Sequence, residues 1–181
     1  MTLFSPFTEQ NLILTGYVGP DQLHLGRKIA EQLRMPFVSV ELEIADRVNL
    51  PVEDILTYYG ATHLKTIEAA IVQETALRRG TVIGISGRIL LNGDHLTRLR
   101  STGIVISLVI ELGAMLRRLH MTMGARYHDP QERAVALAEL KREWAVRGID
   151  GIHEIRTSYQ TQEETIAEVV GLWQKLAVRR G

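Results

Sequence analysis

Residues 16–24 have the outline of a phosphate-binding loop without the side chains that bind phosphate. A loop of the G-x-x-x-x-G-K-[ST] type starting at Gly16 would place a glycine, a lysine and a hydroxyl residue at positions 21, 22 and 23. The glycines that shape the turn, Gly16 and Gly19, are kept. The positions that would contact phosphate and metal carry other residues, namely Asp21, Gln22 and Leu23, followed by His24. Nucleotide binding is the chemistry that such a loop serves, so these replacements bear directly on function.

The size of each loss predicts poor binding of ATP. A lysine contact to phosphate contributes roughly 1.5–3 kcal/mol, or about ten- to a hundredfold in affinity. The Asp21 carboxylate, about 5 Å from one phosphate charge, would oppose binding by roughly 3 kcal/mol at an effective dielectric of 20. Leu23 lacks the hydroxyl that would hold Mg²⁺. A simpler interpretation is that residues 16–24 form an ordinary turn in which Asp21 caps the next helix.

The composition indicates a globular chain of one domain. The 181 residues are 45% apolar and 23% charged, with 21 basic and 21 acidic side chains and no cysteine. This balance gives no attraction to nucleic acid or acidic membranes, and it excludes disulfides and thiolate metal sites. The six histidines are scattered, so we expect no metal site. Residues 1–10 look like an N-terminal extension without the features of a signal peptide, and a cytoplasmic location is expected.

Apolar runs rich in isoleucine and valine alternate with helical patterns along the chain. Continuous apolar runs are typical of parallel strands that are covered on both faces. The runs that predict strands are 11–15, 36–41, 81–86, 103–109 and, as a more polar edge strand, 151–157. This alternation predicts a three-layer α/β/α fold with a five-stranded parallel sheet.

The helical patterns between these runs have clear starting signals. Asp129-Pro130 with Glu132, and Thr161 with Glu164, each predict a capped helix start. The patterns cover 22–33, 62–79, 92–100 and 111–119, and then the two helices that begin after Asp129 and Thr161. Trp144 and Trp173 fall on inward faces of the last two helices and are predicted to anchor the core. Residues 120–129, polar and containing Gly124, are predicted to form a mobile, lid-like loop.

The order and spacing of several motifs resemble the shikimate kinase family over about residues 11–172. No motif is intact, so the resemblance rests on their succession. The matching stretches are Gly26-Arg27 after the first loop, Ser39 and Glu41 after the second strand, Gly60–Glu68 at the spacing of a Gly-x-x-x-Phe-Arg-x-x-Glu motif, Ser86-Gly87-Arg88 at a glycine turn, and Arg98–Leu108 before and through the fourth strand.

The resemblance implies ATP-dependent phosphoryl transfer to a hydroxyl group and a set of site positions. It places Ser39 where the family has a metal-side aspartate, Glu41 where an aspartate holds substrate hydroxyls, and Lys65 where an arginine binds the substrate carboxylate. Arg88 falls in the glycine turn with Ser86 and Gly87, and Arg126 matches an arginine of the lid. A later arginine of the family falls near Arg142 or Glu143.

These residues predict a remnant pocket at the carboxyl ends of the strands, where open α/β sheets bind ligands. Glu41, Lys65, Arg88 and Arg126 are expected to converge there and to hold a small anion. The alternative is a closed cleft in which the same charges pair with one another.

Three functions follow from these residues. The first is a degenerate, inactive member of the family, a pseudoenzyme, that binds a small anionic ligand or a protein partner and needs no cofactor. The second is a small-molecule kinase with a rearranged phosphate site, which would use ATP and Mg²⁺ with Arg88 or Lys28 as the missing cation. The third is a structural or regulatory subunit. We expect no binding to nucleic acid or membranes.

Overall fold

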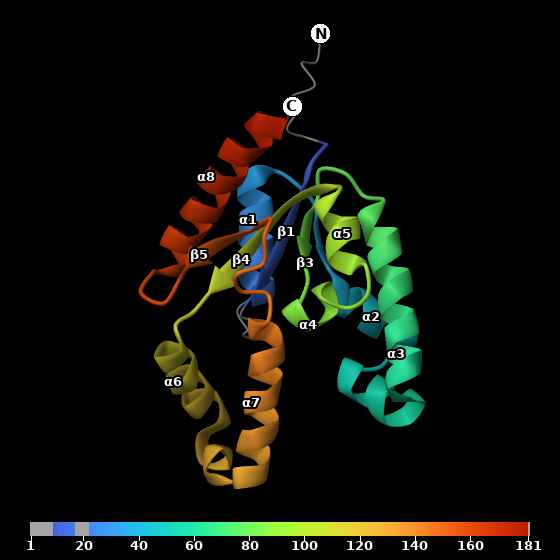
Figure 1. The fold of residues 1–181 in the computed structure, drawn as a ribbon, viewed down its shortest axis with the longest axis vertical. Coiled ribbons are helices and arrows are strands. Elements are labelled where there is room, and N and C mark those ends of the chain that lie inside the picture. The colour runs from blue at the N-terminus through green and yellow to red at the C-terminus, as the bar shows by residue number, and fades with distance from the viewer. Residues whose placement is uncertain (1–8, 17–21, 181) are drawn as a thin grey trace.

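Five parallel strands form one sheet in the order β2-β3-β1-β4-β5 (Figure 1). The computed structural model describes residues 9–16 and 22–180. The strands are β1 (Asn11–Gly16), β2 (Phe37–Ser39), β3 (Val82–Gly84), β4 (Gly103–Val109) and β5 (Ile152–Arg156). In the register, Leu14 lies opposite Gly84 on one side and Ile106 on the other. The five predicted strands and their parallel arrangement are confirmed.

Helices cover both faces of the sheet. They are α1 (Gln22–Leu33), α2 (Val40–Val48), α3 (Val52–Ala76), α4 (Gly87–Leu90), α5 (His95–Arg100), α6 (Leu112–Met123), the 3₁₀ helix η2 (Gly124–His128), α7 (Pro130–Trp144) and α8 (Gln162–Arg180). Ile13 of β1 packs in the core with α2, α3 and α5, whereas Leu12 and Leu14 pack in a second core with α1 and α8. The predicted three-layer fold is therefore confirmed. Among the described residues no helix has the length and apolar character needed to cross a membrane.

The second strand is shorter than predicted because a helix begins inside the expected range. Ser39 has an extended backbone, and its hydroxyl oxygen accepts a hydrogen bond from the Leu42 amide at 3.3 Å. This is an N-cap, and the acidic side chains of Glu41 and Glu43 in the first turn suit the positive end of the helix dipole. Glu41 consequently lies in α2 and not in a strand.

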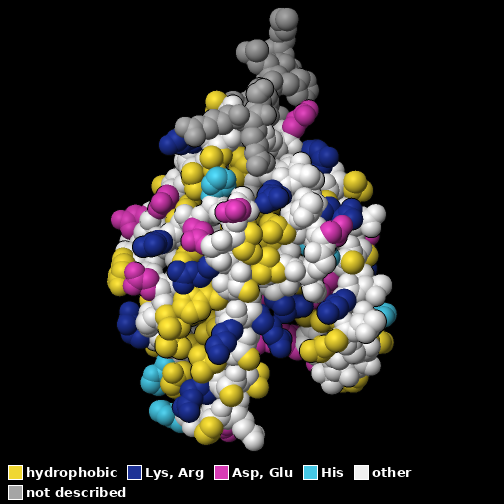
Figure 2. Space-filling model, in the orientation of Figure 1, with side chains coloured by type: hydrophobic (Ala, Val, Ile, Leu, Met, Phe, Trp, Pro, Cys, Tyr) yellow, Lys and Arg dark blue, Asp and Glu magenta, His cyan; other side chains and the backbone are white. Residues whose placement is uncertain are grey.

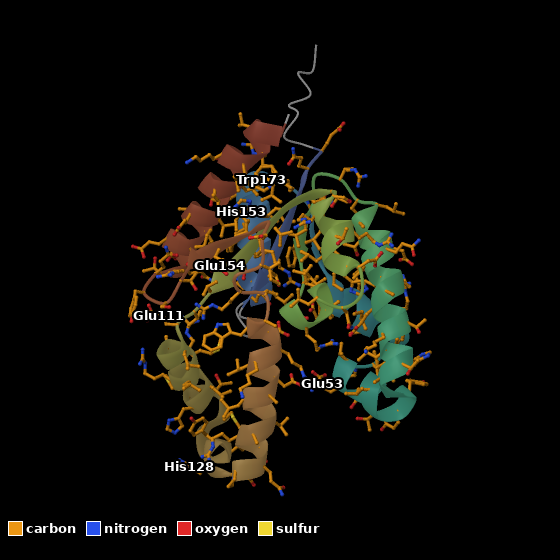
Figure 3. All side chains as sticks on the ribbon, viewed as in Figure 1. Glu53, Glu111, His128, His153, Glu154 and Trp173 are labelled. Atoms are coloured by element: carbon orange, nitrogen blue, oxygen red, sulfur yellow. The ribbon has the colours of Figure 1, made fainter. Side chains whose placement is uncertain are left out.

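The lid-like loop predicted for residues 120–129 is wrong as secondary structure. Helix α6 continues to Met123, and η2 fills most of the remaining range. Gly124, at φ 56°, permits the change of direction between them. The His120 and Tyr127 rings then stack at 4.5 Å. We call α6, η2 and α7 the arm. It extends beyond the carboxyl edge of the sheet, with His128 at its tip (Figures 1 and 3).

The two tryptophans differ in their surroundings. Trp173 on α8 is 4% exposed and belongs to the core, as predicted. Trp144, at the end of α7, is partly exposed, and the Arg147 guanidinium lies 4.8 Å from its ring centroid. Helix α7 has no buried residue at all, because it belongs to the arm and does not cover the sheet. The prediction that Trp144 anchors the core is therefore wrong.

The start of α7 confirms the predicted cap and supplies a test of its strength. Asp129 accepts hydrogen bonds from the backbone amides of Gln131 at 2.8 Å and Glu132 at 3.2 Å. Because α7 has little packing to support it, Asp129→Ala is expected to cost about 1 kcal/mol of local stability. Amide hydrogen exchange at Gln131 and Glu132 should then accelerate about fivefold. Asp129→Ser, which keeps a capping oxygen, should leave the rates nearly unchanged. Equal rates in the wild type and the alanine variant would contradict the role of this cap.

Candidate functional site

The predicted site residues follow strands that end at the same edge of the sheet. Parallel strands bring their carboxyl ends together, so Gly16 at the end of β1, Ser39 at the end of β2 and Ser86 just after β3 lie along this edge. Gly16 has φ 113°, and a Cβ atom there would lie 2.2 Å from the Leu108 carbonyl oxygen of β4. Glycine is therefore required at this position by both backbone conformation and space.

The described positions of residues 16–24 carry no lysine, no arginine and no hydroxyl group. Gly19 and Asp21 lie outside the described residues, so the predicted cap by Asp21 stays a prediction. Gln22, Leu23 and His24 form the first turn of α1, with His24 exposed. The side-chain amide nitrogen of Gln22 is buried and has no hydrogen-bond partner in the described part of the chain. Position 22, where the sequence motif predicts a lysine, thus carries a neutral donor.

Two glutamates from different helices accept hydrogen bonds from the backbone amides that follow β3. The Glu41 Oε1 atom of α2 accepts a hydrogen bond from the Ser86 amide at 2.7 Å. The Glu143 Oε2 atom of α7 accepts one from the next amide, that of Gly87, at 2.6 Å. Adjacent backbone donors bring the two carboxyl groups close together. We call Glu41 and Glu143 the carboxyl pair.

Burial shifts the titration of the carboxyl pair upwards. It raises the pKa of Glu143 to about 7, with a further rise from the Glu41 charge and opposing effects of the Gly87 and Arg88 amides. Burial likewise raises the pKa of Glu41, against the hydrogen bonds from Ser86 and the positive charge of Arg88. Like charges disfavour double ionisation, so the pair carries less negative charge at neutral pH than two ordinary carboxylates would.

Arg88 is held by a carboxylate that is fully removed from solvent. Its Nη2 atom lies 2.7 Å from Oε1 of Glu68, a residue of α3 with an exposed fraction of 0%. Asn92 donates to the other oxygen of Glu68 at 3.2 Å. The Arg88 side chain keeps 29% of its surface exposed. Glu68 fixes the guanidinium in place, and part of the guanidinium still faces solvent.

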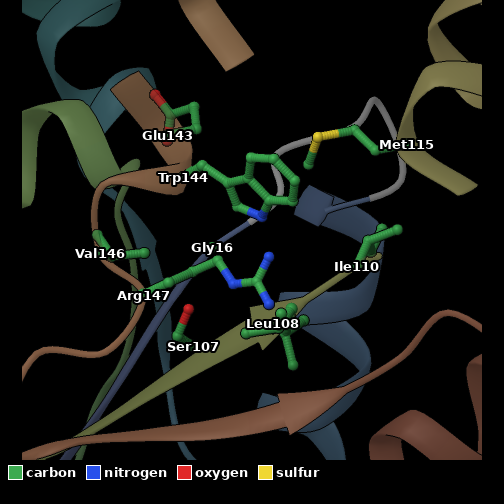
Figure 4. Close-up of a pocket in the computed structure, with 10 residues that line it drawn as sticks. Gly16, Ser107, Leu108, Ile110, Met115, Glu143, Trp144, Val146 and Arg147 are labelled. Atoms are coloured by element: carbon green, nitrogen blue, oxygen red, sulfur yellow. The ribbon is translucent and has the colours of Figure 1, made fainter. Parts of the chain in front are cut away.

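The end of α7 packs directly on the residues after β3. A Cβ atom at Gly87 would lie 2.7 Å from the Glu143 backbone oxygen and 2.9 Å from the Val146 side chain. Figure 4 shows the small cavity beside this contact, of about 10 Å³, between Gly16, Ser107, Trp144 and Arg147. Such a volume has room for about one water molecule. The Ser107 hydroxyl and the Trp144 indole nitrogen are buried without a hydrogen-bond partner in the described residues, and a water molecule would suit them.

Neither Lys65 nor Arg126 has a described interaction with the carboxyl pair or with Arg88. Lys65 is exposed on α3 and makes no hydrogen bond or ion pair within the described ranges. Arg126, at the tip of the arm, pairs with Glu132 at 2.5 Å. Glu143 lies eleven positions after Glu132 on α7, which is a distance of about 16 Å along a helix. Of the four charged residues expected to converge, the structure links only Glu41 and Arg88. Glu41 accepts a hydrogen bond from the Ser86 amide, and Ser86 caps the short helix α4 that carries Arg88.

The face seen in Figure 2 is hollowed between α7 and the start of α3, and acidic and basic side chains gather in that hollow. Of the residues that organise the site, Glu143 was noted from the sequence only as a neighbour of an arginine position, and Glu68 only as part of a motif. Neither pattern indicated that these glutamates would bond to Gly87 and Arg88. Both contacts join distant segments, and the sequence carries no local signal for them.

The fold is shared with solved shikimate kinases. The structure from Bacteroides thetaiotaomicron superposes with a TM-score of 0.72 at 22% identity, covering 92% of this chain and 97% of that one. The enzyme from Acinetobacter baumannii, solved in complex with shikimate, has a TM-score of 0.70 at 18% identity, covering 93% and 95%. These likenesses define an α/β protein with the shikimate kinase fold.

Comparisons of the amino-acid sequence show the family to which the chain belongs. The family model for shikimate kinase matches residues 24–173. A shikimate kinase from Caldanaerobacter subterraneus subsp. tengcongensis is 28% identical over 173 residues, or 94% of this chain and 99% of the relative. One from Geobacter metallireducens is 22% identical over 170 residues. The chain belongs to the shikimate kinase family, which confirms the resemblance found in its motifs.

Proposed function

We propose that this protein is a member of the shikimate kinase family that does not transfer phosphate from ATP. The observation that carries the proposal is the occupation of the Ser86 and Gly87 amides by the chain's own carboxyl pair. Gln22 and Leu23 add to it, because they supply neither the cation nor the metal-binding hydroxyl that a phosphate loop needs. The residues present therefore do not fit ATP with Mg²⁺, and no cofactor is expected.

The group best suited to bind a ligand in this cleft is Arg88. Its guanidinium has five N–H donors in a planar fork, and one nitrogen contacts Glu68. The partly exposed remainder can take the carboxylate of a small anionic ligand. Protonation of the carboxyl pair removes competing negative charge, so anion binding should be stronger at pH 6 than at pH 8. A protein partner that presents an acidic side chain would use the same chemistry.

The second candidate function is a kinase with a rearranged phosphate site. It is favoured by the named relatives, which are called shikimate kinases and align over nearly the whole chain. Arg88 and Lys28, the cations considered for such a site, have other partners: Arg88 pairs with Glu68 and Lys28 with Glu31 at 3.5 Å. ATP and Mg²⁺ would then be required. A cytoplasmic location, like the absence of nucleic-acid and membrane binding, stays a prediction of the sequence.

The experiment that separates these functions is calorimetry with ATP, ADP and shikimate, with and without Mg²⁺, together with a coupled assay for ADP release. We expect no ADP release above the rate without enzyme. Shikimate serves as a carboxylate probe and should bind more tightly at pH 6 than at pH 8. Micromolar affinity for ATP, or turnover, would overturn the first proposal in favour of the second.

The role of Arg88 can be tested with a variant that keeps the buried charge balanced. Arg88→Lys retains a cation for Glu68 but loses the planar fork, so the affinity for the carboxylate probe should fall about tenfold. Arg126→Lys, an exposed change at the tip of the arm, is the matched control and should leave the affinity unchanged. If both variants lose affinity for the carboxylate probe equally, or if neither loses affinity, Arg88 is not part of the proposed site.

A further inference from the structure

A second cavity lies at the opposite, amino edge of the sheet. It has a volume of about 420 Å³ and is lined by the end of α1, the segment before β3 and the last turns of α8. Leu33, Met35, Trp173 and Val178 supply apolar walls. Cavities that bind small molecules are commonly 300–1,000 Å³ and mostly apolar, with a few polar groups. This cavity has the size and the walls of such a site.

The cavity is separate from the carboxyl pair and Arg88. Leu33 and Met35 precede β2, and Gly80 of the cavity precedes β3, so all three lie before the strands begin. The carboxyl pair binds to amides that come after β3 has ended. A ligand in this cavity would therefore not touch the site discussed above.

Among the described residues that line this cavity, Arg34 is the one that carries a charge. It ends α1 with φ 55°, in the left-handed region, where the Met35 amide donates to the Ala30 carbonyl at 2.9 Å. This helix ending favours glycine, because a side chain is strained there. Arg34 is exposed, and its guanidinium has no ion pair or hydrogen bond with the side chains that the structure describes, those of residues 9–16 and 22–178. A cation without a partner among the described side chains thus lies beside an apolar cavity, at a position where glycine would be more stable.

We propose that this cavity binds a small carboxylate with an aromatic or branched aliphatic body. The body packs against Met35 and the Trp173 ring, and the carboxylate accepts two hydrogen bonds from the Arg34 guanidinium. The single cation among the described lining residues, with the apolar walls, suits one negative charge better than the two of a phosphate monoester. Contact with Trp173 makes binding visible in the fluorescence of that residue.

The probe is 4-fluorobenzoate, titrated with the full-length protein by ligand-observed fluorine NMR. A compound of this size should bind with a millimolar dissociation constant or tighter. Arg34→Gly should weaken binding about ten- to a hundredfold, since it removes a charge-assisted hydrogen-bond pair. The same variant should unfold at an equal or higher temperature, because glycine relieves the left-handed backbone. Loss of binding in this variant therefore has no explanation in misfolding.

Three controls localise the interaction. Arg27→Gln removes an exposed arginine from the same helix and should leave binding unchanged. Arg88→Lys should leave the Trp173 fluorescence response to 4-fluorobenzoate unchanged even where it weakens carboxylate binding at the carboxyl edge, which separates the two sites. The neutral probe 4-fluorobenzyl alcohol should bind at least tenfold more weakly than 4-fluorobenzoate. In a Trp144→Phe background, 4-fluorobenzoate should change the fluorescence of Trp173.

The inference is overturned by any of three results. These are no binding of 4-fluorobenzoate at 10 mM, equal binding of the acid and the alcohol, and unchanged affinity in Arg34→Gly. A loss of affinity in Arg88→Lys in place of Arg34→Gly would assign the carboxylate to the other edge of the sheet.

Discussion

Replacing Glu143 by glutamine is expected to raise the free energy of unfolding at pH 8 by about 2–3 kcal/mol. The pKa of Glu143 is raised from 4.5 to about 7, mainly by burial, so the folded protein holds this proton more tightly than the unfolded chain does. A shift of one unit corresponds to about 1.4 kcal/mol. Glutamine has no charge to bury, and its amide oxygen can still accept from the Gly87 amide.

The gain in the free energy of unfolding from Glu143→Gln should increase with pH between about 4.5 and 7. Below pH 4.5 the carboxyl group is protonated in both states and contributes no difference. As the pH rises from 4.5 to 7 the unfolded chain loses the proton while the folded protein keeps it, so the stability of the wild type falls. Above pH 7 both states are ionised and the loss is complete. Glu41 acts in the same direction, so the variant should retain a smaller slope.

Urea unfolding at pH 5 and pH 8 measures this difference. The gain from Glu143→Gln should be small at pH 5 and reach its full size at pH 8. Glu139→Gln, an exposed change one turn earlier on α7, is the matched control and should alter neither value by more than about 0.5 kcal/mol. A gain that is the same at both pH values would show that the carboxyl pair does not titrate in this window.

Placing the side chains of a phosphate loop at residues 21–23 is expected to give the protein affinity for ATP. The wild type is expected to bind ATP–Mg²⁺ more weakly than about 1 mM, since Gln22 and Leu23 lack the required groups. Asp21 adds repulsion of about 3 kcal/mol at 5 Å from a phosphate charge. The triple variant Asp21→Gly, Gln22→Lys, Leu23→Ser removes the repulsion and supplies the cation and the hydroxyl. Its affinity should rise by at least tenfold to a hundredfold.

Phosphoryl transfer need not return with binding. In the triple variant the Ser39 hydroxyl still caps α2, and Glu143 still accepts the hydrogen bond from the Gly87 amide. Gln32→Lys, at the other end of α1, adds the same positive charge away from the loop and should give no gain. Calorimetry with ATP–Mg²⁺ measures all three proteins. A triple variant that folds normally and gains no affinity would show that residues 16–24 are not a disabled phosphate site.

The elements and their order could be predicted because their causes are local. Continuous apolar runs such as 103–109 need the cover of two helical layers, wherever those layers come from. The starts of α7 and α8 depend on contacts within three residues: Asp129 with Glu132, and Thr161 with Glu164. The succession of weak motifs was then enough to indicate the family. The predicted boundary of an element was wrong where one residue both ends a strand and caps a helix, as Ser39 does.

The arrangement of charges in the cleft was decided by tertiary structure. Glu143 reaches Gly87 across 56 positions of sequence, and Glu41 reaches Ser86 across 45. Which side chains meet in this way depends on how the arm and α2 pack beside the sheet, and periodicity carries no information on that packing. Arg126, by contrast, pairs with a residue only six positions later, Glu132, at the tip of the arm and away from Arg88. The sequence determined the sheet, the helix caps and the family, whereas long-range packing alone determined that the chain's own carboxyl groups occupy the amides after β3.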